Sequence, residues 1–521
     1  MTKETAFRLA KPKKKGLLPL LFSRFFIIAL LLVWQVLLIV GFYGWLNDYF
    51  TYFSAFIGLF SLAMVIYLFN NRMDSTAKLT WMLILSVVPL PGAILLWFTQ
   101  TNAGHRWITH RVAELIDETK DAIPQDADVL TALAENDSGT GDLSTYLNRS
   151  GCFPIYDHTE VRYFTLGEDK FAAMLEELKR AEQSIFMEYF IIEEGYMWGE
   201  ILKILIEKAA AGVDVRVLYD GMCELSTLPA NYRKLLSQHG IKAKAFSPIR
   251  PFLSSHYNYR DHRKILVIDG KVAFNGGVNL ADEYINHIER FGHWKDTALM
   301  LKGPAVRSFT LLFLQMWNID EKVSDFSPVT AEVLESPDAQ GYVMPYGDCP
   351  LDNDKVGEAV YMDILNRAND YVYIMSPYLI LDGELETALK FAAQRGIDVR
   401  LILPGIPDKK MAYALAKSHY APLVDAGVKI YEYTPGFVHA KVFVSDDCKA
   451  VVGTINLDYR SLYHHFECAT YLYQTPCIPD IHADFLATQE KCRQVTPESI
   501  KNESAYYKIM GSLMKFIAPL M

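Results

Sequence analysis

The sequence predicts an α/β protein that consists of two repeated halves and is preceded by membrane-spanning helices. Three observations lead to this prediction. Uncharged apolar runs crowd the first hundred residues, a set of strand-like and helix-like blocks then occurs twice in the same order, and each copy of the set ends in a motif with the same spacing.

The apolar runs are Phe25–Leu46, Tyr52–Phe69 and Leu79–Thr99. A run of about 20 apolar residues spans the hydrocarbon core of a bilayer, so the first and third runs are long enough and the second is marginal. A cleaved signal peptide is the alternative for the first run. That run, however, is long, lacks an A-x-A cleavage site and is followed at once by more apolar sequence. Residues 1–105 are therefore expected to form a multi-pass membrane anchor.

The side of the membrane on which the rest of the chain lies stays open. The basic stretch Lys11–Lys15 and Arg24 favour a cytoplasmic N-terminus. Three crossings would then place the chain after Gln100 outside the cytoplasm. The segment Val87–Gly92, "VVPLPG", interrupts the third run with two prolines and a glycine, so this run could instead kink or return. Arg106 beyond it fits a cytoplasmic exit.

The charge and the cysteines narrow the class of protein. The net charge of −10 argues against general nucleic-acid binding. The cysteines are scattered without C-x-x-C spacing, which indicates free thiols and neither a zinc site nor a disulfide framework. They are Cys152, Cys223, Cys349, Cys448, Cys468, Cys477 and Cys492. The sequence does not specify an oligomeric state.

Beyond the anchor, the chain is expected to divide into a linker at 106–150, a first half at 151–330, a second half at 331–495 and an apolar tail at 496–521. A linker or a loosely packed helix is predicted there because the centre of the segment, "NDSGTGD", is rich in turn-forming residues. The tail "SAYYKIMGSLMKFIAPLM" has lysines as its only charged residues. It is expected to lie on the membrane, to line an acyl-chain entrance, or to dock on the protein itself.

The repeat after residue 150 has four matched blocks. The first copy contains "SIFMEYFII", "AGVDVRVLYDG" and "GIKAKAF", and the second contains "YVYIMSPYLIL", "RGIDVRLILPG" and "GVKIYEY". The apolar, β-branched runs predict buried strands, and "WGEILKILIEKAAA" has the apolar spacing of a helix. A strand, a helix and a strand in succession predict a parallel βαβ unit. Two such halves are expected to pack into one body with pseudo-twofold symmetry.

The fourth block is the motif, "DHRKILVIDGKVAFNGGVN" in the first half and "VHAKVFVSDDCKAVVGTIN" in the second. A single His-x-Lys pair is usually a surface or strand-edge feature, but here the whole spacing recurs inside a repeat. The matching residues of the two copies are His262, Lys264, Asp269, Gly277 and Asn279, and His439, Lys441, Asp446, Thr454 and Asn456.

These residue types indicate phosphoryl chemistry that does not depend on a metal. Residues two apart on a strand face the same side, so His262 and Lys264 are expected to project together. Two lysines and two asparagine amides suit the oxygens of a phosphate, and the glycines before Asn279 let the backbone approach it closely. Two histidines suit a double displacement, in which one attacks phosphorus and the other protonates the leaving alcohol. No metal and no cofactor are expected, because lysine supplies the positive charge.

Four carboxylates are assigned roles around this pocket. Asp269 and Asp446 complete the two catalytic sets and are expected to cap the ends of their strands. Asp296 and Glu467, each about thirty residues after the histidine of its own copy, are candidates for holding the far nitrogen of an imidazole. The other histidines near the motifs are interpreted as packing or surface residues, namely His256, His287, His293, His464 and His465.

The pair of motifs resembles the HKD signature of the phospholipase D superfamily, and most of all that of bacterial cardiolipin synthases. The segments "NYRDHRKILVIDGKVAFNGGVNLADEY", "FGHWKDTALMLKGPAV", "GFVHAKVFVSDD" and "GTINLDYRSLYHHFE" resemble that family, as does the N-terminal region with "PLPG". The resemblance implies a phospholipase D-like fold in each half, a location in the bacterial cell membrane and phosphatidylglycerol as substrate. Family members commonly have two N-terminal membrane segments, whereas this chain has three apolar runs.

The implied reaction is a transphosphatidylation, in which two phosphatidylglycerols give cardiolipin and glycerol. The resemblance makes His262 the nucleophile that forms a phosphatidyl-histidine, and His439 the acid and then the base. Two alternatives use the same residues: a membrane-anchored phospholipase that hydrolyses lipid with water, and a transferase with another acceptor. A superfamily nuclease is disfavoured by the acidic charge and the anchor. A lipid-binding protein without activity is disfavoured because both motif copies are intact.

Overall fold

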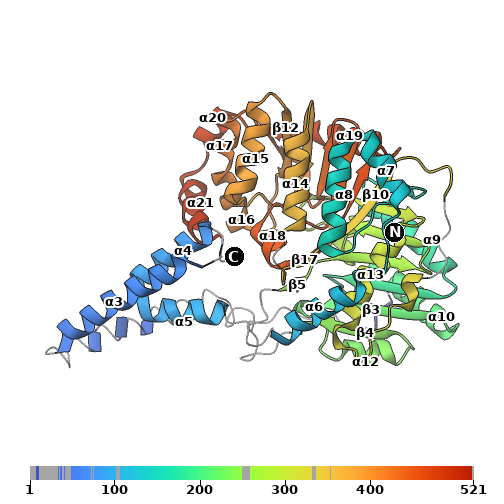
Figure 1. Ribbon diagram of the computed structural model, residues 1–521, viewed down its shortest axis with the longest axis horizontal. Helices are drawn as coiled ribbons and strands as arrows, with labels where there is room; N and C mark the ends of the chain where they lie inside the picture. Colours follow the sequence, from blue (N-terminus) through green and yellow to red (C-terminus); the bar gives the residue numbers. More distant parts are fainter. Residues whose placement is uncertain are drawn as a thin grey trace. The chain divides into compact units, whose positions relative to one another are not determined.

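The structure is a computed structural model, and it describes residues 7–10, 33–34, 36–37, 40–41, 49–71, 73, 75–100, 106–248, 259–330, 336–352 and 354–518. The chain forms two compact units. The larger one contains Met1–Lys13, Ile108–Pro248 and Asn258–Met514, and the smaller one contains Lys14–Trp107, Ile249–Tyr257 and Lys515–Met521. The larger unit holds both copies of the motif; Figure 1 draws its first half mainly in green and its second half in orange and red.

The first half of the larger unit is built on a seven-stranded mixed sheet. In sheet order, its strands are β1 (Glu160–Phe164), β9 (Ala298–Lys302), β7 (Val272–Gly276), β6 (Lys264–Ile268), β2 (Ser184–Tyr189), β3 (Asp214–Asp220) and β4 (Lys242–Phe246). Its helices are α9 (Gly167–Arg180), α10 (Tyr196–Ala210), α11 (Met222–Ser226), α12 (Tyr232–Ser237), η3 (Asp282–Ile285), α13 (Val306–Trp317), η4 (Asn318–Asp320) and η5 (Ser327–Thr330).

The second half repeats this strand order. Its sheet runs β10 (Tyr342–Asp348), β17 (His465–Tyr473), β16 (Lys449–Gly453), β15 (Val442–Ser445), β11 (Tyr371–Met375), β12 (Asp398–Pro404) and β13 (Lys429–Tyr433), with β18 (Cys492–Gln494) at the edge. Its helices are α14 (Val356–Arg367), α15 (Gly383–Gln394), α16 (Lys410–Ser418), α17 (Tyr420–Asp425), α18 (Tyr459–Tyr463) and α19 (Ile478–Gln489). The matching order confirms the prediction of two repeated α/β halves.

Only part of each sheet is parallel. The predicted βαβ unit is present as β2–α10–β3 in the first half and as β11–α15–β12 in the second. The motif strands β6 and β15 pair antiparallel with β2 and β11, and each forms an antiparallel hairpin with the strand that follows it. The hairpins turn tightly because two successive residues in each have positive φ, Asp269 and Gly270 in one and Asp446 and Asp447 in the other.

Two short strand pairs join the halves. Strand β5 (Arg260–Asp261), just before the first motif histidine, pairs in parallel with β17 of the second half. Strand β14 (Gly436–Val438), just before the second, pairs in parallel with β8 (His293–Lys295) of the first half. Each motif histidine therefore follows a strand that is paired with the opposite half.

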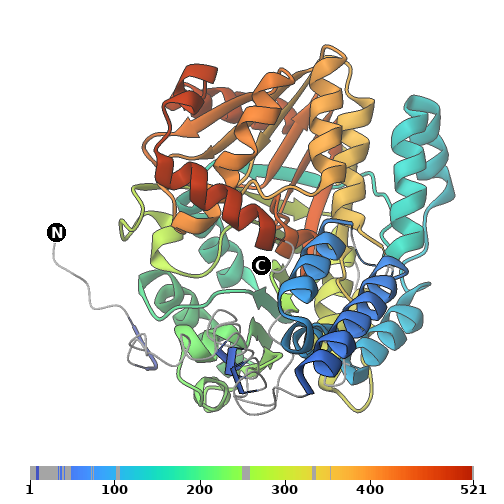
Figure 2. The same cartoon turned by 90° about the vertical axis from the view of Figure 1, so that its left-hand side faces the viewer.

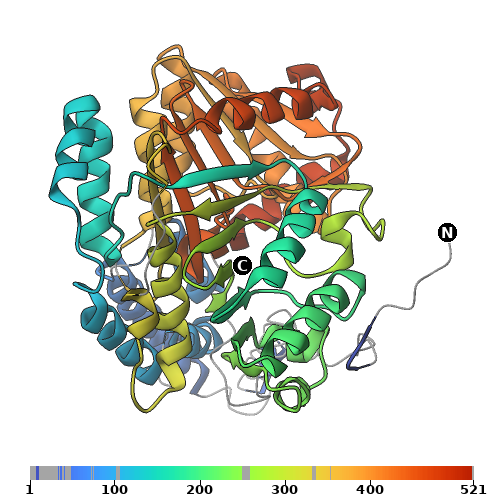
Figure 3. The ribbon, with the colours of Figure 1, turned by 90° about the vertical axis from the view of Figure 1, so that its right-hand side faces the viewer.

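Residues 106–150 form helices that are closely packed, so the segment is neither a linker nor a loosely packed helix. Their helices are α6 (Arg106–Thr119), α7 (Ala127–Asn136) and α8 (Ser138–Gly151). Leu133 and Leu147 are fully buried in the core that includes the second half. The glycines that suggested flexibility serve close packing, because a Cβ at Gly141 would lie 3.0 Å from the Cβ of Ala134 on α7. Figure 3 shows α7 and α8 side by side in teal.

In the smaller unit, one of the described helices is long and apolar enough to cross a membrane. It is α3 (Phe50–Phe69), in which Thr51–Phe69 has a mean hydropathy of 2.0. This helix corresponds to the second apolar run, which the sequence makes marginal by length. Most of the first run, Phe25–Leu46, lies outside the described residues.

The third apolar run forms two helices instead of one continuous span. They are α4 (Ser75–Val87) and α5 (Pro89–Gln100). Pro89 occupies the first position of α5, where its missing N–H costs no helical hydrogen bond. The chain folds back at this point, because a Cβ at Gly92 would lie 3.2 Å from Cγ2 of Ile84, eight residues earlier. The interruption predicted at "VVPLPG" is present.

The C-terminal tail forms α20 (Pro497–Lys501) and α21 (Ala505–Ile517). One face of α21 docks on the second half, where a Cβ at Gly511 would lie 2.5 Å from the carbonyl oxygen of Ala414 on α16. Figure 2 shows α21 in red. The expectation that the tail docks on the protein is therefore confirmed, but another face of the same helix carries exposed apolar side chains. They are Tyr506, Ile509, Leu513 and Phe516.

A short N-terminal segment packs against the first half. Phe7, Leu9 and Ala10 contact its core. Gly199 in α10 makes room for the segment, because a Cβ there would lie 2.5 Å from the carbonyl oxygen of Phe7. The residues before the apolar runs and the α/β halves after them thus belong to the same compact unit.

Candidate active site

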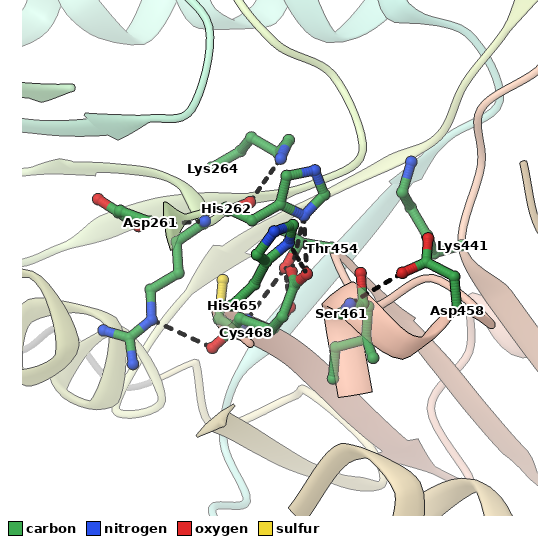
Figure 4. A network of polar contacts seen from close by, with 12 residues as sticks. Asp261, His262, Lys264, Lys441, Thr454, Asp458, Ser461, His465 and Cys468 are labelled. Carbon is green, nitrogen blue, oxygen red and sulfur yellow. Dashed lines mark hydrogen bonds and ion pairs between the residues drawn. The ribbon is translucent and has the colours of Figure 1, made fainter. Parts of the chain in front are cut away.

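The two motif histidines are buried in one site to which both halves contribute. His262 precedes β6 and His439 precedes β15, and their exposed fractions are 6% and 7%. The positive charge of Lys441, from the second half, acts on His262 in the first. Figure 4 shows Lys264 beside His262, with Lys441 directed toward the same region. The structure thus brings together the two His-x-Lys pairs that the sequence singled out.

Each imidazole is held by a carboxylate from the opposite half. Nδ1 of His262 lies 2.8 and 2.9 Å from the two carboxylate oxygens of Glu467. Nδ1 of His439 lies 2.7 Å from Oδ2 of Asp296. Carboxylate oxygens accept, so each Nδ1 carries the proton and each Nε2 keeps its lone pair; Nε2 of His439 lies 3.1 Å from Nζ of Lys441. The pairing is crossed between the two halves, which the spacing within each copy did not indicate.

The backbone explains the crossed pairing. The N–H of His262 donates to the carbonyl oxygen of Phe466 at 2.9 Å, and the N–H of His439 donates to that of Lys295 at 2.7 Å. Each carbonyl belongs to the residue just before an orienting acid. The parallel strand pairs between the halves therefore set the histidine of one half against the acid of the other.

The two motif lysines are buried and point back to their own histidines. Nζ of Lys264 donates to the carbonyl oxygen of His262 at 2.5 Å, and Nζ of Lys441 donates to that of His439. Burial lowers the pKa of Lys264 to about 8 and that of Lys441 to about 7, although Glu467 and Asp296 respectively oppose the shift. A bound anion would favour the charged ammonium groups.

The two imidazoles are neutral at pH 7 in the free protein. Burial, followed by the charge of Lys264, holds the pKa of His262 well below its ordinary value. Burial and the charge of Lys441 lower the pKa of His439 to about 4, although Asp296 opposes this. A phosphodiester anion in the pocket would raise both pKa values by the same electrostatic reasoning.

Gly277 and Thr454, which occupy equivalent positions, each accommodate one orienting acid in a different way. A Cβ at Gly277 would lie 2.1 Å from Oδ1 of Asp296, so only glycine leaves room for this carboxylate. Oγ1 of Thr454 instead donates to Oε2 of Glu467. Both residues therefore support the acids that hold the histidines. No contact of theirs within the described chain assigns them to phosphate binding.

The two motif asparagines have different surroundings. Oδ1 of Asn279 accepts from the N–H of Ile191 at 3.1 Å, and its Nδ2 donates to the hydroxyl of Tyr284 at 2.9 Å, so its amide is engaged. Oδ1 of Asn456 is buried and has no hydrogen-bond partner among the described residues. Because this oxygen accepts hydrogen bonds, as the oxygens of a phosphate do, the contacts of the described residues assign neither amide to phosphate binding.

The motif aspartates are structural in this fold, which corrects their place in the catalytic sets. The carboxylate of Asp269 accepts from the backbone N–H groups of Glu182, Gln183 and Ser184 at 2.7–2.9 Å. That of Asp446 accepts from the N–H groups of Asn369, Asp370 and Tyr371 at 2.8–3.0 Å. Each lies past the far end of its motif strand from the histidine and holds the start of the adjacent strand. The expected capping role is confirmed.

His465 lies beside His262 and Glu467, although it was interpreted as a packing or surface residue. Its ring centroid lies 5.3 Å from that of His262, and its Nδ1 lies 3.6 Å from Oε1 of Glu467. Sequence spacing contained the signal, since His465 and Glu467 are two apart on β17 and thus face the same side. His287 and His293 contact Tyr196 and Tyr433 and stay outside the site, and His256 lies outside the described residues.

Two further residues that the sequence reasoning missed support the loops after the motif hairpins. Nζ of Lys170 in α9, fully buried, donates to the carbonyl oxygen of Val278 at 3.4 Å. The hydroxyl of Tyr361 in α14 donates to the carbonyl oxygen of Ile455, the residue equivalent to Val278, at 2.9 Å. The two donors differ in type, so no repeated sequence pattern marked them.

The two α/β halves have the same strand order and share one buried site of two histidines and two lysines. This arrangement defines a two-domain enzyme of the phospholipase D type. A family model described as "Cardiolipin synthase, PLD-like domain" matches residues 174–317 and 361–488. The chain therefore belongs to the cardiolipin synthase family of phospholipase D-like proteins, and it is a phosphatidyltransferase of that type.

Relatives with similar sequences cover nearly the whole chain. An uncharacterised protein of Streptococcus mutans is 57% identical over 460 residues, which are 88% of this chain and 100% of the relative. Cardiolipin synthases of Halalkalibacterium halodurans and Alkalihalophilus pseudofirmus are 33% and 34% identical over 482 and 483 residues. These alignments cover 92% of this chain in each case, and 95% and 94% of the two relatives.

A solved structure shares the fold at low sequence identity. The crystal structure of phosphatidylserine synthase from Haemophilus influenzae aligns with 73% of this chain and 97% of its own, with a TM-score of 0.55 and 14% identity. At this identity the likeness concerns the fold alone, and it agrees with the arrangement of two phospholipase D-like halves.

Proposed function

We propose that this chain is a cardiolipin synthase that transfers the phosphatidyl group of one phosphatidylglycerol to the hydroxyl of another and releases glycerol. The observation that carries the proposal is the pair of crossed contacts, His262 with Glu467 and His439 with Asp296. They leave two oriented imidazoles in one pocket, as a double displacement requires. Relatives named cardiolipin synthase add to this support.

In the first step, Nε2 of His262 attacks the phosphorus of a phosphatidylglycerol. The N–P bond forms while the bond from phosphorus to the glycerol headgroup oxygen breaks, and His439 gives its Nε2 proton to that oxygen. Glu467 stabilises the positive charge that develops on the attacking imidazole. For His439 to carry a proton, the anionic substrate must raise its lowered pKa, so substrate binding and activation of the acid are coupled.

In the second step, the headgroup hydroxyl of another phosphatidylglycerol attacks the phosphatidyl-histidine. His439, now neutral, takes the hydroxyl proton, the new O–P bond forms and the N–P bond breaks. The assignment of His262 as the nucleophile and of His439 as the acid and base follows the family resemblance. Lys264 and Lys441 are assigned to the phosphate oxygens.

Burial of the pocket favours transfer over hydrolysis. The motif histidines are more than nine-tenths buried, which limits the access of bulk water to the phosphatidyl-histidine, whereas a second lipid presents its hydroxyl at high local concentration in the membrane. A hydrolase with the same residues would give phosphatidic acid.

We also infer that the enzyme is a multi-pass protein of the bacterial cell membrane whose catalytic unit faces the cytoplasm. The segment with Phe7 and Leu9 packs on the first half, so an even number of crossings must separate it from the catalytic unit. The basic residues Lys11–Lys15 place this side inside. Tags at both chain ends should resist protease in spheroplasts and be cleaved in inverted vesicles, and cleavage of either tag in spheroplasts would contradict this arrangement.

The experiment that tests the function is a product assay of the purified full chain in phosphatidylglycerol vesicles with EDTA. Cardiolipin and glycerol in equal amounts are expected, because no step uses a metal. His262→Ala and His439→Ala should abolish the product, and His464→Ala, a neighbouring histidine, should retain it. Phosphatidic acid as the sole product would make the enzyme a hydrolase. Acid-quenched enzyme should carry the phosphatidyl group on the peptide with His262, and label on the peptide with His439 would reverse the two roles.

A further inference from the structure

His465 is a buried polar side chain that the proposed reaction does not use. It is 7% exposed, and neither Nδ1 nor Nε2 has a hydrogen-bond partner among the described residues. Buried polar atoms are nearly always paired, so an unpaired imidazole inside a site calls for a ligand or another role. Figure 4 shows the ring of His465 next to that of His262.

The side chains of His262, His465 and Glu467 form a cluster of metal-ligand type. One ligand atom from each lies within 4.8 Å of the others. Nδ1 of His262 is 2.8 Å from Oε1 of Glu467, and Nδ1 of His465 is 3.6 Å from the same oxygen. Two imidazoles and one carboxylate are a donor set that suits Zn²⁺ and similar transition ions, which take nitrogen ligands, far better than Mg²⁺ or Ca²⁺, which prefer oxygen.

We propose that His262, His465 and Glu467 bind a divalent transition metal such as Zn²⁺ and that this metal inhibits the enzyme. In the free protein, the proton on Nδ1 of His262 lies between the imidazole and Glu467. A metal bound to both residues would take the place of that proton and draw electron density from the ring. His262 would then be a poorer nucleophile, and Glu467 would no longer be free to stabilise its positive charge.

The second half of the active site cannot bind a metal in the same way. The residue two before Asp296, which corresponds to His465, is Trp294, and its ring lies 5.5 Å from that of His439. Tryptophan offers no metal ligand. The site would therefore bind one metal, on the His262 side. Trp294 also shows that this fold accepts an aromatic side chain at the position equivalent to His465.

The surrounding charges set the expected affinity. Glu467 supplies one negative charge, whereas the ammonium group of Lys264 lies close by and repels a cation. The lysine is hydrogen bonded to the carbonyl oxygen of His262. We therefore expect moderate affinity, so that added Zn²⁺ inhibits reversibly and a chelator restores activity.

The test uses the full chain in detergent micelles, titrated with ZnCl₂ by calorimetry and with CoCl₂ by visible absorption. We expect one Zn²⁺ per chain and a cobalt spectrum with nitrogen and oxygen ligands. His465→Phe should weaken binding by about tenfold or more, and His464→Phe, the matched control, should bind like the wild type. Equal affinity in wild type and His465→Phe, or the absence of a cobalt spectrum, would overturn the site.

The inhibitory effect rests on the proposed function and is tested separately. In the vesicle assay, micromolar ZnCl₂ should block cardiolipin formation by the wild type and by His464→Phe, EDTA should reverse the block, and MgCl₂ should have no effect. His465→Phe should be active without metal and require at least about ten times more ZnCl₂ for half-inhibition. Equal inhibition of His465→Phe would refute the inhibitory role. If no cardiolipin forms under any condition, the proposed function fails, while the cobalt titration still decides the metal site.

Discussion

Replacement of Glu467 by glutamine should slow the reaction strongly and leave the fold intact. Both carboxylate oxygens lie within 2.9 Å of Nδ1 of His262. Loss of one charge-assisted hydrogen bond costs about 1.5–3 kcal/mol, which corresponds to roughly 10- to 150-fold in rate. Glutamine can also present its NH₂ group to Nδ1, and this would place the proton on Nε2 and block the attack. Amide replacements of this kind lower kcat by about 10⁴-fold in other imidazole–carboxylate pairs.

We therefore expect Glu467→Gln to lower kcat by between about 10²- and 10⁴-fold. Its thermal stability should not fall, because glutamine has nearly the same shape as glutamate and avoids the cost of a buried charge. The assay is the initial rate of cardiolipin formation in mixed micelles, with the unfolding temperature measured on the same preparation.

The matched control is Asp269→Asn, which alters a carboxylate of the same motif set. Asp269 binds three backbone N–H groups away from the imidazoles. Its replacement should destabilise the protein by about 1–2 kcal/mol, as for other backbone caps, and leave kcat of the folded enzyme nearly unchanged. A kcat of Glu467→Gln within about threefold of the wild type, or a larger loss of kcat in Asp269→Asn than in Glu467→Gln, would refute the crossed assignment.

Three further predictions concern pH, the core and the membrane. Because Lys441 and Lys264 have pKa values of about 7 and about 8 and must be charged to bind a phosphodiester, kcat/KM should fall as pH rises through this range. A pH profile that stays flat to pH 9.5 would contradict this. Because folding lowers the pKa values of both lysines, the unfolded chain binds these protons more tightly than the folded chain does. The free energy of unfolding should therefore increase as pH rises from about 7 to 10.5, and this gain should disappear as pH falls through the same range. Leu147→Ala should cost about 2–5 kcal/mol in chemical denaturation, because this side chain is fully buried, and a change below about 0.5 kcal/mol would restore the view of residues 106–150 as a linker. The double substitution Ile509→Glu and Leu513→Glu should raise KM for phosphatidylglycerol in the vesicle assay, because it removes apolar side chains of α21 that face the bilayer. Leu486→Glu, at an exposed leucine on α19, is its control, and equal KM values for both variants would show that α21 does not contact lipid.

Local patterns in the sequence were sufficient for the repeat, its strands and the residues of the two His-x-Lys pairs. Alternation along a strand follows from backbone geometry, so His262 and Lys264 project together whatever lies around them. The hairpin turns after β6 and β15 also follow from local chemistry, because aspartate tolerates the positive φ that a tight turn requires.

The glycines of residues 106–150 show where local patterns mislead. "NDSGTGD" has the composition of a flexible loop, yet Gly141 lets α8 approach Ala134 of α7, and the leucines around it enter the core. Composition does not distinguish a glycine that provides freedom from one that provides space. Only the packed neighbour decides between the two.

The sequence by itself determined which side chains are the candidates for the chemistry, and the tertiary structure decided how they are paired. His262 takes its carboxylate from Glu467 because β5 pairs with β17 across the two halves, and no spacing within one copy reports such a contact. The same packing brings His465 next to His262. It also gives Asn279 hydrogen-bond partners at both amide atoms, whereas Oδ1 of Asn456 has none among the described residues. Contacts between segments far apart in the chain depend on how the two sheets meet, and pseudo-symmetry alone does not specify whether each half completes its own site or that of its partner half.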